Sequence, residues 1–161
     1  MKSTNKNDPS AAGLKGDPIA FKALTEIAII AHLADNLFAK HLPDNLTTAQ
    51  FGVLNHLLRL DRQETIGELA AAMQVAQPTM SSTVRKLEDK GFVKLVAKEN
   101  DRRVRNVCVT ASGKAIRNKS IKKIEPMQAS MGRDISDKEW KNLLSGLTKI
   151  RTILDLSLIH I

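Results

Sequence analysis

The fold is decided by residues 78–98, which read PTMSSTVRKLEDKGFVKLVAK. In the first half of this stretch apolar residues recur at three- and four-residue steps, and the members of this series are Met80, Val84 and Leu87. That spacing is the period of a helix with one buried face. Gly91 is a residue that commonly ends helices, and after it apolar residues alternate with polar ones, as in a strand. The stretch therefore predicts a helix that leads directly into a β-strand.

A second alternating stretch follows a polar run at residues 99–103. Its members are, in order, Arg105, Asn106, Val107, Cys108 and Val109. Two alternating stretches separated by a short polar segment predict a β-hairpin, here with a charged tip. We expect Cys108, which points away from its two valine neighbours, to lie on the more exposed face.

Two helices precede the helix of residues 78–90, and both begin with a capping box. Thr47 and Gln50 form the first box, and Thr65 and Glu68 form the second. In such a box the side chains of the two residues satisfy N–H groups that the start of a helix leaves free. Three short helices followed by a hairpin make a winged helix-turn-helix. The sequence therefore predicts a mostly α fold with a small β-wing.

Helices with continuous apolar stripes flank the winged helix, at residues 17–41 and 136–158. Between them Thr110 can start another helix, which we expect Pro126 to kink or break. Apolar stripes of this kind must be buried. Burial across a two-fold axis is favoured because two-fold dimers are the commonest oligomers, so we expect N- and C-terminal dimerisation helices. The alternative is that the two ends pack only on each other within one chain.

The chain is basic, and its excess of positive charge lies in one region. It has 161 residues with 25 Lys and Arg against 17 Asp and Glu, a net charge of +8. Residues 59–123 contain 15 Lys and Arg and 7 Asp and Glu, which accounts for the whole excess. A localised basic region is typical of a protein that binds a polyanion, most often nucleic acid. The alternative is that the charge only keeps the protein in solution.

The predicted helix of residues 78–90 has an outward face suited to DNA. Its buried residues leave Ser82 and Arg85 on the opposite face, with Pro78 and Asp89. Small hydroxyl residues allow a helix to enter the major groove, which is about 12 Å wide, and Arg can pair bidentately with guanine. The alternative is an ordinary solvated helix face. We expect base contacts from Thr79, Ser81, Ser82 and Arg85, and a backbone contact from Lys86.

The predicted hairpin tip is rich in cations, namely Lys98, Arg102, Arg103 and Arg105. A basic β-arm suits the phosphate backbone, or a minor groove whose negative potential attracts Arg. We expect Asp101 to pair with a nearby Arg and fix the tip, which leaves another Arg free; Arg103 is favoured for the groove. The alternative is a charged, solvated turn.

The predicted wing resembles that of a known family. Residues 101–110 read DRRVRNVCVT and are followed by Gly113. This run is similar to the D-x-R-x-x-x-V-x-L-T-x-x-G wing signature of the multiple-antibiotic-resistance regulator (MarR) family, with Val109 in place of the usual Leu.

Other segments extend the resemblance to about residues 20–158. Residues 65–70 (TIGELA) and 82–93 (STVRKLEDKGFV) resemble the helix-turn-helix of the family. Residues 135–140 (ISDKEW) resemble the opening of its last helix.

The resemblance implies a homodimeric winged-helix transcription regulator, usually a repressor, whose first and last helices form the dimer interface. Its recognition helix would enter the major groove of double-stranded DNA and its wing the adjacent minor groove, at a pseudo-palindromic operator. Many members release DNA when a small molecule binds, but no motif here identifies effector-binding residues. We expect residues 17–161 to form one unit, with a DNA-binding lobe at 45–110 and dimerisation helices at 17–42 and 111–161, and residues 1–16 to be a disordered tail.

Other functions find little support in the sequence. It has no G-x-S-x-G, H-E-x-x-H, G-x-x-x-x-G-K-[ST] or G-x-G-x-x-G motif, so we predict a protein that is not an enzyme. The His residues are scattered, so we expect neither a metal site nor a cofactor, and a redox role for Cys108 is disfavoured. The lack of a long apolar segment and of a secretory signal favours the cytoplasm. The alternative function is a dimeric winged-helix module that binds a protein or a small ligand instead of DNA.

Overall fold

The computed structural model describes residues 16–98 and 101–159, and its elements follow the predicted order. The N-terminal half contains α2 (Ile19–His41), α3 (Thr48–Leu60), β1 (Glu64–Thr65), α4 (Ile66–Ala72) and α5 (Gln77–Asp89). The C-terminal half contains β2 (Val93–Lys98), β3 (Asp101–Val109), α6 (Ala111–Met131) and α7 (Asp137–Ile159). The predicted fold class, mostly α with a small β-wing, is confirmed. The predicted tail, apart from Gly16, lies outside the described residues.

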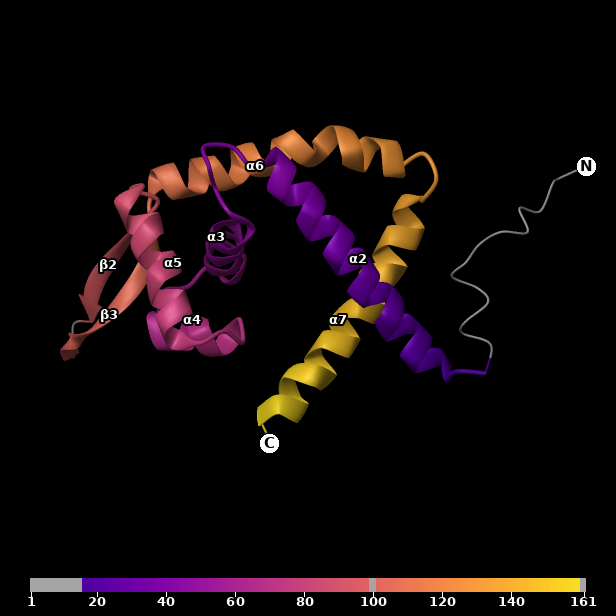
Figure 1. The fold of residues 1–161 in the computed structure, drawn as a ribbon, viewed down its shortest axis with the longest axis horizontal. Helices are drawn as coiled ribbons and strands as arrows, with labels where there is room; N and C mark the ends of the chain where they lie inside the picture. Colours follow the sequence, from indigo (N-terminus) through magenta and orange to yellow (C-terminus); the bar gives the residue numbers. More distant parts are fainter. Residues whose placement is uncertain (1–15, 99–100, 160–161) are drawn as a thin grey trace, which may run out of the picture.

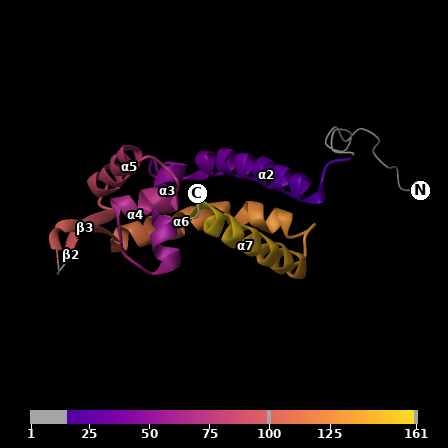
Figure 2. The same cartoon turned by 90° about the horizontal axis from the view of Figure 1, so that it is seen from below.

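The chain divides into a lobe and three long helices, α2, α6 and α7 (Figure 1). In the lobe α3, α4, α5 and the strands gather together, and α6 runs from there to the other end of the molecule, where α7 follows it. The turned view in Figure 2 places the wing strands at the tip of the lobe, away from α7. α2 and α7 cross, and together they line a small apolar hollow formed by Ala20, Ala23, Leu24, Ile150, Ile153 and Leu154.

The predicted capping boxes begin their helices. At α3 the Thr47 hydroxyl accepts a hydrogen bond from the Gln50 backbone N–H, and the Gln50 side chain accepts one from the Thr47 N–H, both at 3.2 Å. At α4 the Glu68 carboxylate accepts from the Thr65 N–H at 2.6 Å. This backbone bond, with a second bond from the Thr65 hydroxyl, holds the pKa of Glu68 below its usual value because both bonds favour the charged carboxylate.

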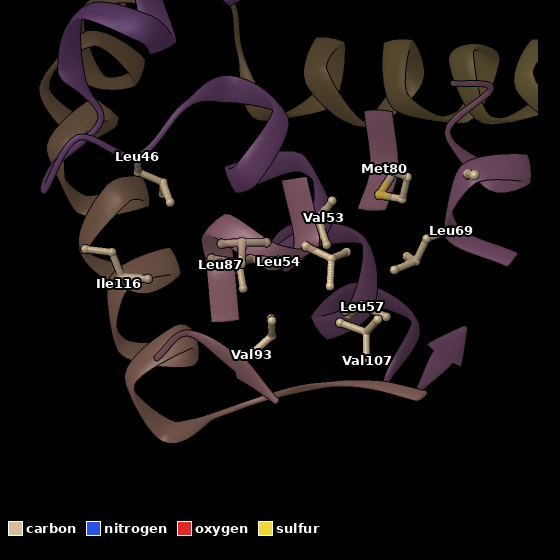
Figure 3. Packing of buried hydrophobic residues seen from close by; sticks show 12 residues of the cluster. Leu46, Val53, Leu54, Leu57, Leu69, Met80, Leu87, Val93, Val107 and Ile116 are labelled. Carbon is tan, nitrogen blue, oxygen red and sulfur yellow. The ribbon is translucent and has the colours of Figure 1, made fainter. Parts of the chain in front are cut away.

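A single apolar core holds the lobe together (Figure 3). The predicted inward residues of α5 are confirmed, since Met80, Val84 and Leu87 are all buried. They pack in one cluster with side chains from α3, α4, β2, β3 and α6, among them Val53, Leu54, Leu57, Leu69, Val93, Val107 and Ile116. Burying large aliphatic side chains in one cluster stabilises the lobe by about 1.5–3 kcal/mol for each residue. The face of α5 that points outward is therefore fixed by the core.

The sheet has the strand order β1-β3-β2, and both pairs are antiparallel. β2 and β3 form the predicted hairpin, with Val93 opposite Val109. β1 was not predicted, because two residues are too few to show an alternating pattern. It pairs Glu64 with Val107 and so attaches the segment between α3 and α4 to the wing.

The end of the hairpin is joined to the start of α6 by a tight corner. The Thr110 hydroxyl donates to the Gly91 carbonyl at 2.7 Å, and the Thr110 N–H donates to the Phe92 carbonyl at 3.0 Å. The same hydroxyl accepts from the Gly113 N–H at 3.0 Å, as predicted for a helix cap. A Cβ atom at Gly113 would lie 2.0 Å from the Phe92 carbonyl oxygen. The corner therefore leaves no room for a side chain at this position.

Of the predicted kink or break at Pro126, the break is wrong, because α6 continues through this residue to Met131; the kink stays a prediction. Proline removes one backbone donor, but its fixed φ is compatible with a helix. The helix is also held by one buried stripe, formed by Ile116, Ser120 and Ile124, which stabilises the turns that precede the lost bond.

The expected exposure of Cys108 is also wrong, because only 7% of the residue is accessible. Cys108 does point away from the main core cluster, which contains its neighbour Val107. Alternation along β3 therefore separates Cys108 from the main core cluster, but it does not make the residue accessible. Burial raises the pKa of the Cys108 thiol, since the thiolate is poorly solvated there.

We predict that Gly113→Ala lowers the free energy of unfolding by about 3 kcal/mol, because the new methyl group meets a backbone carbonyl that cannot move alone. Gly67→Ala is the control, since the nearest atom to a Cβ there is 4.0 Å away; it should be neutral or stabilise by up to about 1 kcal/mol. Urea titration followed by circular dichroism measures both. Equal stability of the two variants would contradict the tight corner.

We also predict that the native protein reacts with a colorimetric thiol reagent at least about tenfold more slowly than the denatured chain, because Cys108 is buried and protonated at neutral pH. The rate of thiol release in buffer and in denaturant measures this difference. Fast labelling of the native protein would show that the thiol is accessible.

Candidate nucleic-acid interface

Helix α5 presents the predicted face to solvent. Ser82 and Arg85 lie opposite the buried stripe and are exposed. Ser81 lies at the edge of this face and is half-buried. The other outward residues are Pro78, Thr79, Lys86 and Asp89, all of which are exposed.

The polar groups of this face are available to a ligand. Among the described residues no hydrogen bond or ion pair engages the side chains of Ser82, Arg85 or Lys86. In contrast, the Thr83 hydroxyl donates to the Thr79 carbonyl within the helix at 3.0 Å. The start of α5 is also open, because its N-cap residue, Ala76, supplies no side-chain bond. The free N–H groups of a helix start carry partial positive charge and suit a phosphate.

The wing places two of the predicted cations on one face. Arg103 and Arg105 are two residues apart on β3 and both are exposed, while Lys98 at the end of β2 is half-buried. The side chain of Arg102 lies outside the described part of the structure. This pair of guanidinium groups provides the positive charge at the tip of the lobe.

Asp101 orders the tip through the backbone of the wing, and its expected pairing with an Arg stays a prediction because the side chain of Arg102 lies outside the described part of the structure. Its Oδ1 atom accepts a hydrogen bond from the backbone N–H of Arg103 at 3.0 Å. Among the described side chains it forms no ion pair with Arg103 or Arg105. An Asp side chain that accepts from the N–H two residues ahead stabilises a local turn. Asp101 therefore holds the backbone of Arg103 and leaves its guanidinium group free.

A hollow of about 430 Å³ joins the wing to the helix-turn-helix. Its lining includes Gln77 from the start of α5 and the two arginines of the wing, Arg103 and Arg105. The start of α5 and the basic wing therefore lie beside one another. Gln77 was not predicted as a site residue, because it precedes the apolar pattern of the helix. Its position next to Pro78, a proline in the first turn of a helix, could have indicated that it lies at the helix start.

Sequence reasoning also missed Lys90, which holds the other end of α5. Its ammonium group donates to the Asn45 carbonyl at 2.7 Å and to Gln50 Oε1 at 3.1 Å. Gln50 is itself buried and belongs to the capping box of α3. These partners are 45 and 40 residues away in sequence, so no local pattern could have identified them. This contact sets where α5 ends relative to α3.

Features of other site types are missing from the described ranges. No group of three or more His, Cys, Asp or Glu residues in residues 16–98 and 101–159 could hold a metal ion. Within the same ranges, no helix is both long enough and apolar enough to cross a membrane.

Comparison with known proteins identifies the helix-turn-helix and part of the wing. Residues 44–104 match the sequence model of the MarR family. The transcriptional activatory protein BadR of Rhodopseudomonas palustris is 33% identical over 75 residues, which is 45% of this chain and 43% of BadR. The match therefore spans less than half the length of that relative.

Solved structures match over most of the chain. The transcriptional regulator BldR from Sulfolobus solfataricus is 26% identical, with a TM-score of 0.71 over 83% of this chain and 94% of BldR. A point mutant of MepR from S. aureus, solved bound to an oligodeoxyribonucleotide, is 23% identical and has a TM-score of 0.57 over 82% of this chain and 97% of MepR. The MepR likeness shows a shared fold. Over residues 44–104 this chain is therefore similar to the MarR family, and over most of its length it shares the fold of BldR.

Proposed function

We propose that this protein is a homodimeric, sequence-specific DNA-binding transcription regulator that acts as a repressor. The observation that carries this proposal is that the start of α5 lies beside the basic wing, while the outward side chains of α5 and of the wing are free. Gln77 at the start of α5 and the wing residues Arg103 and Arg105 border one hollow, so α5 and the wing can contact the same duplex. A module that binds only a protein or a small ligand would not need this cationic surface.

Each predicted site residue has a role in this proposal. Ser82 and Arg85 read base edges in the major groove, with Thr79 and Ser81 beside them. Lys86 binds the DNA backbone. The wing arginines, Arg102, Arg103 and Arg105, bind the backbone or the adjacent minor groove. Asp101 keeps the tip of the wing in shape through the Arg103 N–H.

Two relatives support a role on DNA. MepR, which shares the fold, was solved with an oligodeoxyribonucleotide, and BadR is named a transcriptional activatory protein. The proposed repression rests on the family resemblance, because the regulators of that family are usually repressors. Release by a small molecule stays a prediction that rests on the family resemblance.

The exposed apolar faces of α2 and α7 support a dimer. α2 contains no buried residue, and Ile30 and Leu33 are 58% and 61% exposed. On α7, Leu144 is 65% exposed. Large contiguous apolar surfaces on a single chain mark interfaces, and packing of the two ends on each other within one chain leaves these residues uncovered. We propose dimerisation helices at residues 17–42 and 111–161 and a DNA-binding lobe at residues 45–110.

The proposal is tested by selecting the DNA that the purified protein retains from fragmented genomic DNA of its host, then measuring affinity for the selected site and for a scrambled duplex. We expect the selected site to be pseudo-palindromic and to bind at least about a thousandfold more tightly at physiological salt. Equal affinity for both duplexes would contradict sequence-specific regulation.

We predict that Arg85→Ala weakens binding to the selected site by about 1–3 kcal/mol and leaves binding to the scrambled duplex nearly unchanged, because Arg85 contacts bases. Fluorescence anisotropy with both duplexes measures the difference. A uniform loss on both duplexes would assign Arg85 to the backbone instead.

We predict that Arg103→Ala weakens binding to both duplexes and reduces the slope of log affinity against log salt by about 1, because one phosphate contact is lost. Arg133→Ala, an exposed position between α6 and α7, is the matched control and should retain the wild-type slope. Unchanged affinity of the Arg103 variant at physiological salt would remove the wing from the interface.

We predict that Leu144→Glu converts a dimer into a monomer, since it places a charge in the proposed interface. Light scattering on a sizing column should give about twice 17.7 kDa for the wild type and 17.7 kDa for the variant. Val75→Glu, at an apolar residue of the lobe that is 39% exposed, should remain dimeric. A monomeric wild type would contradict the dimer.

A further inference from the structure

Lys90, the residue directly after α5, joins this helix to the segment between α2 and α3. Its ammonium group donates to the Asn45 carbonyl oxygen at 2.7 Å and to Gln50 Oε1 at 3.1 Å. Gln50 Oε1 also accepts from the Thr47 N–H at 3.2 Å, so one oxygen atom serves both the cap of α3 and the end of α5. Among the described residues Lys90 forms no ion pair. Its charge is therefore met by neutral acceptors.

The turn between α2 and α3 holds these acceptors in place. Asp44 and Asn45 both have left-handed backbone conformations, with φ of 56° and 52°, which Asp and Asn tolerate better than most residues. The Asp44 carboxylate pairs with Lys119 of α6 at 3.2 Å, and Leu46 is buried in the core of the lobe. Side chains from α5 and α6 thus hold the same turn, and the Asn45 carbonyl has a defined position.

The bonds of Lys90 restrict a motion that the core restricts less. The apolar stripe fixes which face of α5 points outward, but apolar contacts are non-directional, so they oppose a small tilt of the helix less than hydrogen bonds do. The start of α5 has no side-chain cap. Ser82 lies eight residues before Lys90, which is about 12 Å along the helix, so a tilt of about 5° at the Lys90 end moves Ser82 by about 1 Å.

A displacement of this size matters for reading bases. Hydrogen bonds vary by only about 0.5 Å in length, so a shift of about 1 Å breaks a contact to a base edge. Contacts to the DNA backbone are less sensitive, because long, flexible cationic side chains can follow a phosphate. A change in the tilt of α5 therefore affects sequence discrimination more than general affinity for DNA.

Two plainer explanations of Lys90 make different predictions. A cation at the end of a helix is stabilised by the partial negative charge there, and a cation near a DNA-binding surface can bind a phosphate. The first explains a lysine at this position, but not why it bonds to the cap of another helix. The second needs a free ammonium group, whereas that of Lys90 is bonded to two oxygen atoms.

We propose that Lys90 is a positioning residue for DNA reading: its two bonds to Asn45 and Gln50 fix the tilt of α5 and so determine how well the protein distinguishes its operator from other DNA. This inference rests on the proposed DNA-binding function. Loss of the bonds reduces discrimination between sequences and leaves the attraction to the DNA backbone in place.

The test compares Lys90→Met with the wild type in the full chain, at a temperature where circular dichroism shows that both are folded. Fluorescence anisotropy measures affinity for the selected site and for the scrambled duplex. We expect the ratio of the two affinities to fall by about tenfold or more, the effect of one lost base contact. The slope of log affinity against log salt on the scrambled duplex should be unchanged, because no phosphate contact is lost.

Three further variants separate position from charge and from stability. Lys114→Met removes the same charge from an exposed lysine of α6 and should keep the wild-type ratio. Ile124→Val lowers stability at a buried residue of α6 and should keep the ratio as well. Lys90→Arg retains a cation with several donors and should restore most of the discrimination.

Hydrogen exchange of the free protein provides a measurement that does not need DNA. In Lys90→Met the amides at the start of α3, among them the capped Gln50 N–H, should exchange at least about threefold faster than in the wild type, because their cap has lost a partner. Unchanged exchange would show that the contact does not form in solution.

The other outcomes separate this inference from the proposed function. A wild type that binds both duplexes equally contradicts the proposed function, and this inference with it. A discriminating wild type contradicts this inference alone if Lys90→Met discriminates equally well, if its salt slope falls by about 1 as for a lost phosphate contact, if either α6 variant loses the ratio to the same extent, or if Lys90→Arg restores nothing.

Discussion

The proposed DNA interface depends on the burial of one face of α5. Met80, Val84 and Leu87 are each at most 2% exposed, in a core shared by the helices and strands of the lobe. A helix whose apolar stripe is fixed has no freedom to rotate about its axis, because rotation would expose the stripe and bury charged groups. Ser82 and Arg85 face outward for this reason alone.

Contacts at the C-terminal end of α5 then set its position in the lobe. Lys90 joins its last turn to the capping box of α3, and the corner around Thr110 and Gly113 joins the following hairpin to α6. The strand β1 attaches the wing to the segment that precedes α4. The helix and the wing are thus held by the same core, and the hollow between them has a fixed shape. The Thr and the Gly at the end of the wing signature have a structural reason here. The Thr110 hydroxyl forms the bonds of the corner, and a side chain at Gly113 would meet the backbone.

The helices α2 and α7 differ from the lobe, because many of their apolar side chains are not buried within the chain. α2 and α7 cross and both line a small hollow, yet residues such as Leu33 and Leu144 remain more than 60% exposed. One chain cannot bury both stripes, because two crossing helices share only a short contact. The proposed dimer uses the apolar face of α7, whereas Arg151 and Asp155 of the same helix border a hollow beside the lobe.

The order of the helices and of the hairpin, the helix starts and the outward face of α5 follow from the sequence alone, because these depend on local periodicity and on capping residues three positions apart. It could not determine that Cys108 is covered or that α6 continues through Pro126, since both depend on how whole elements pack. Only the tertiary structure brought Lys90 to Gln50 and Glu64 to Val107. These pairs are far apart in the chain, and their contacts arise from the packing of whole elements rather than from any local pattern.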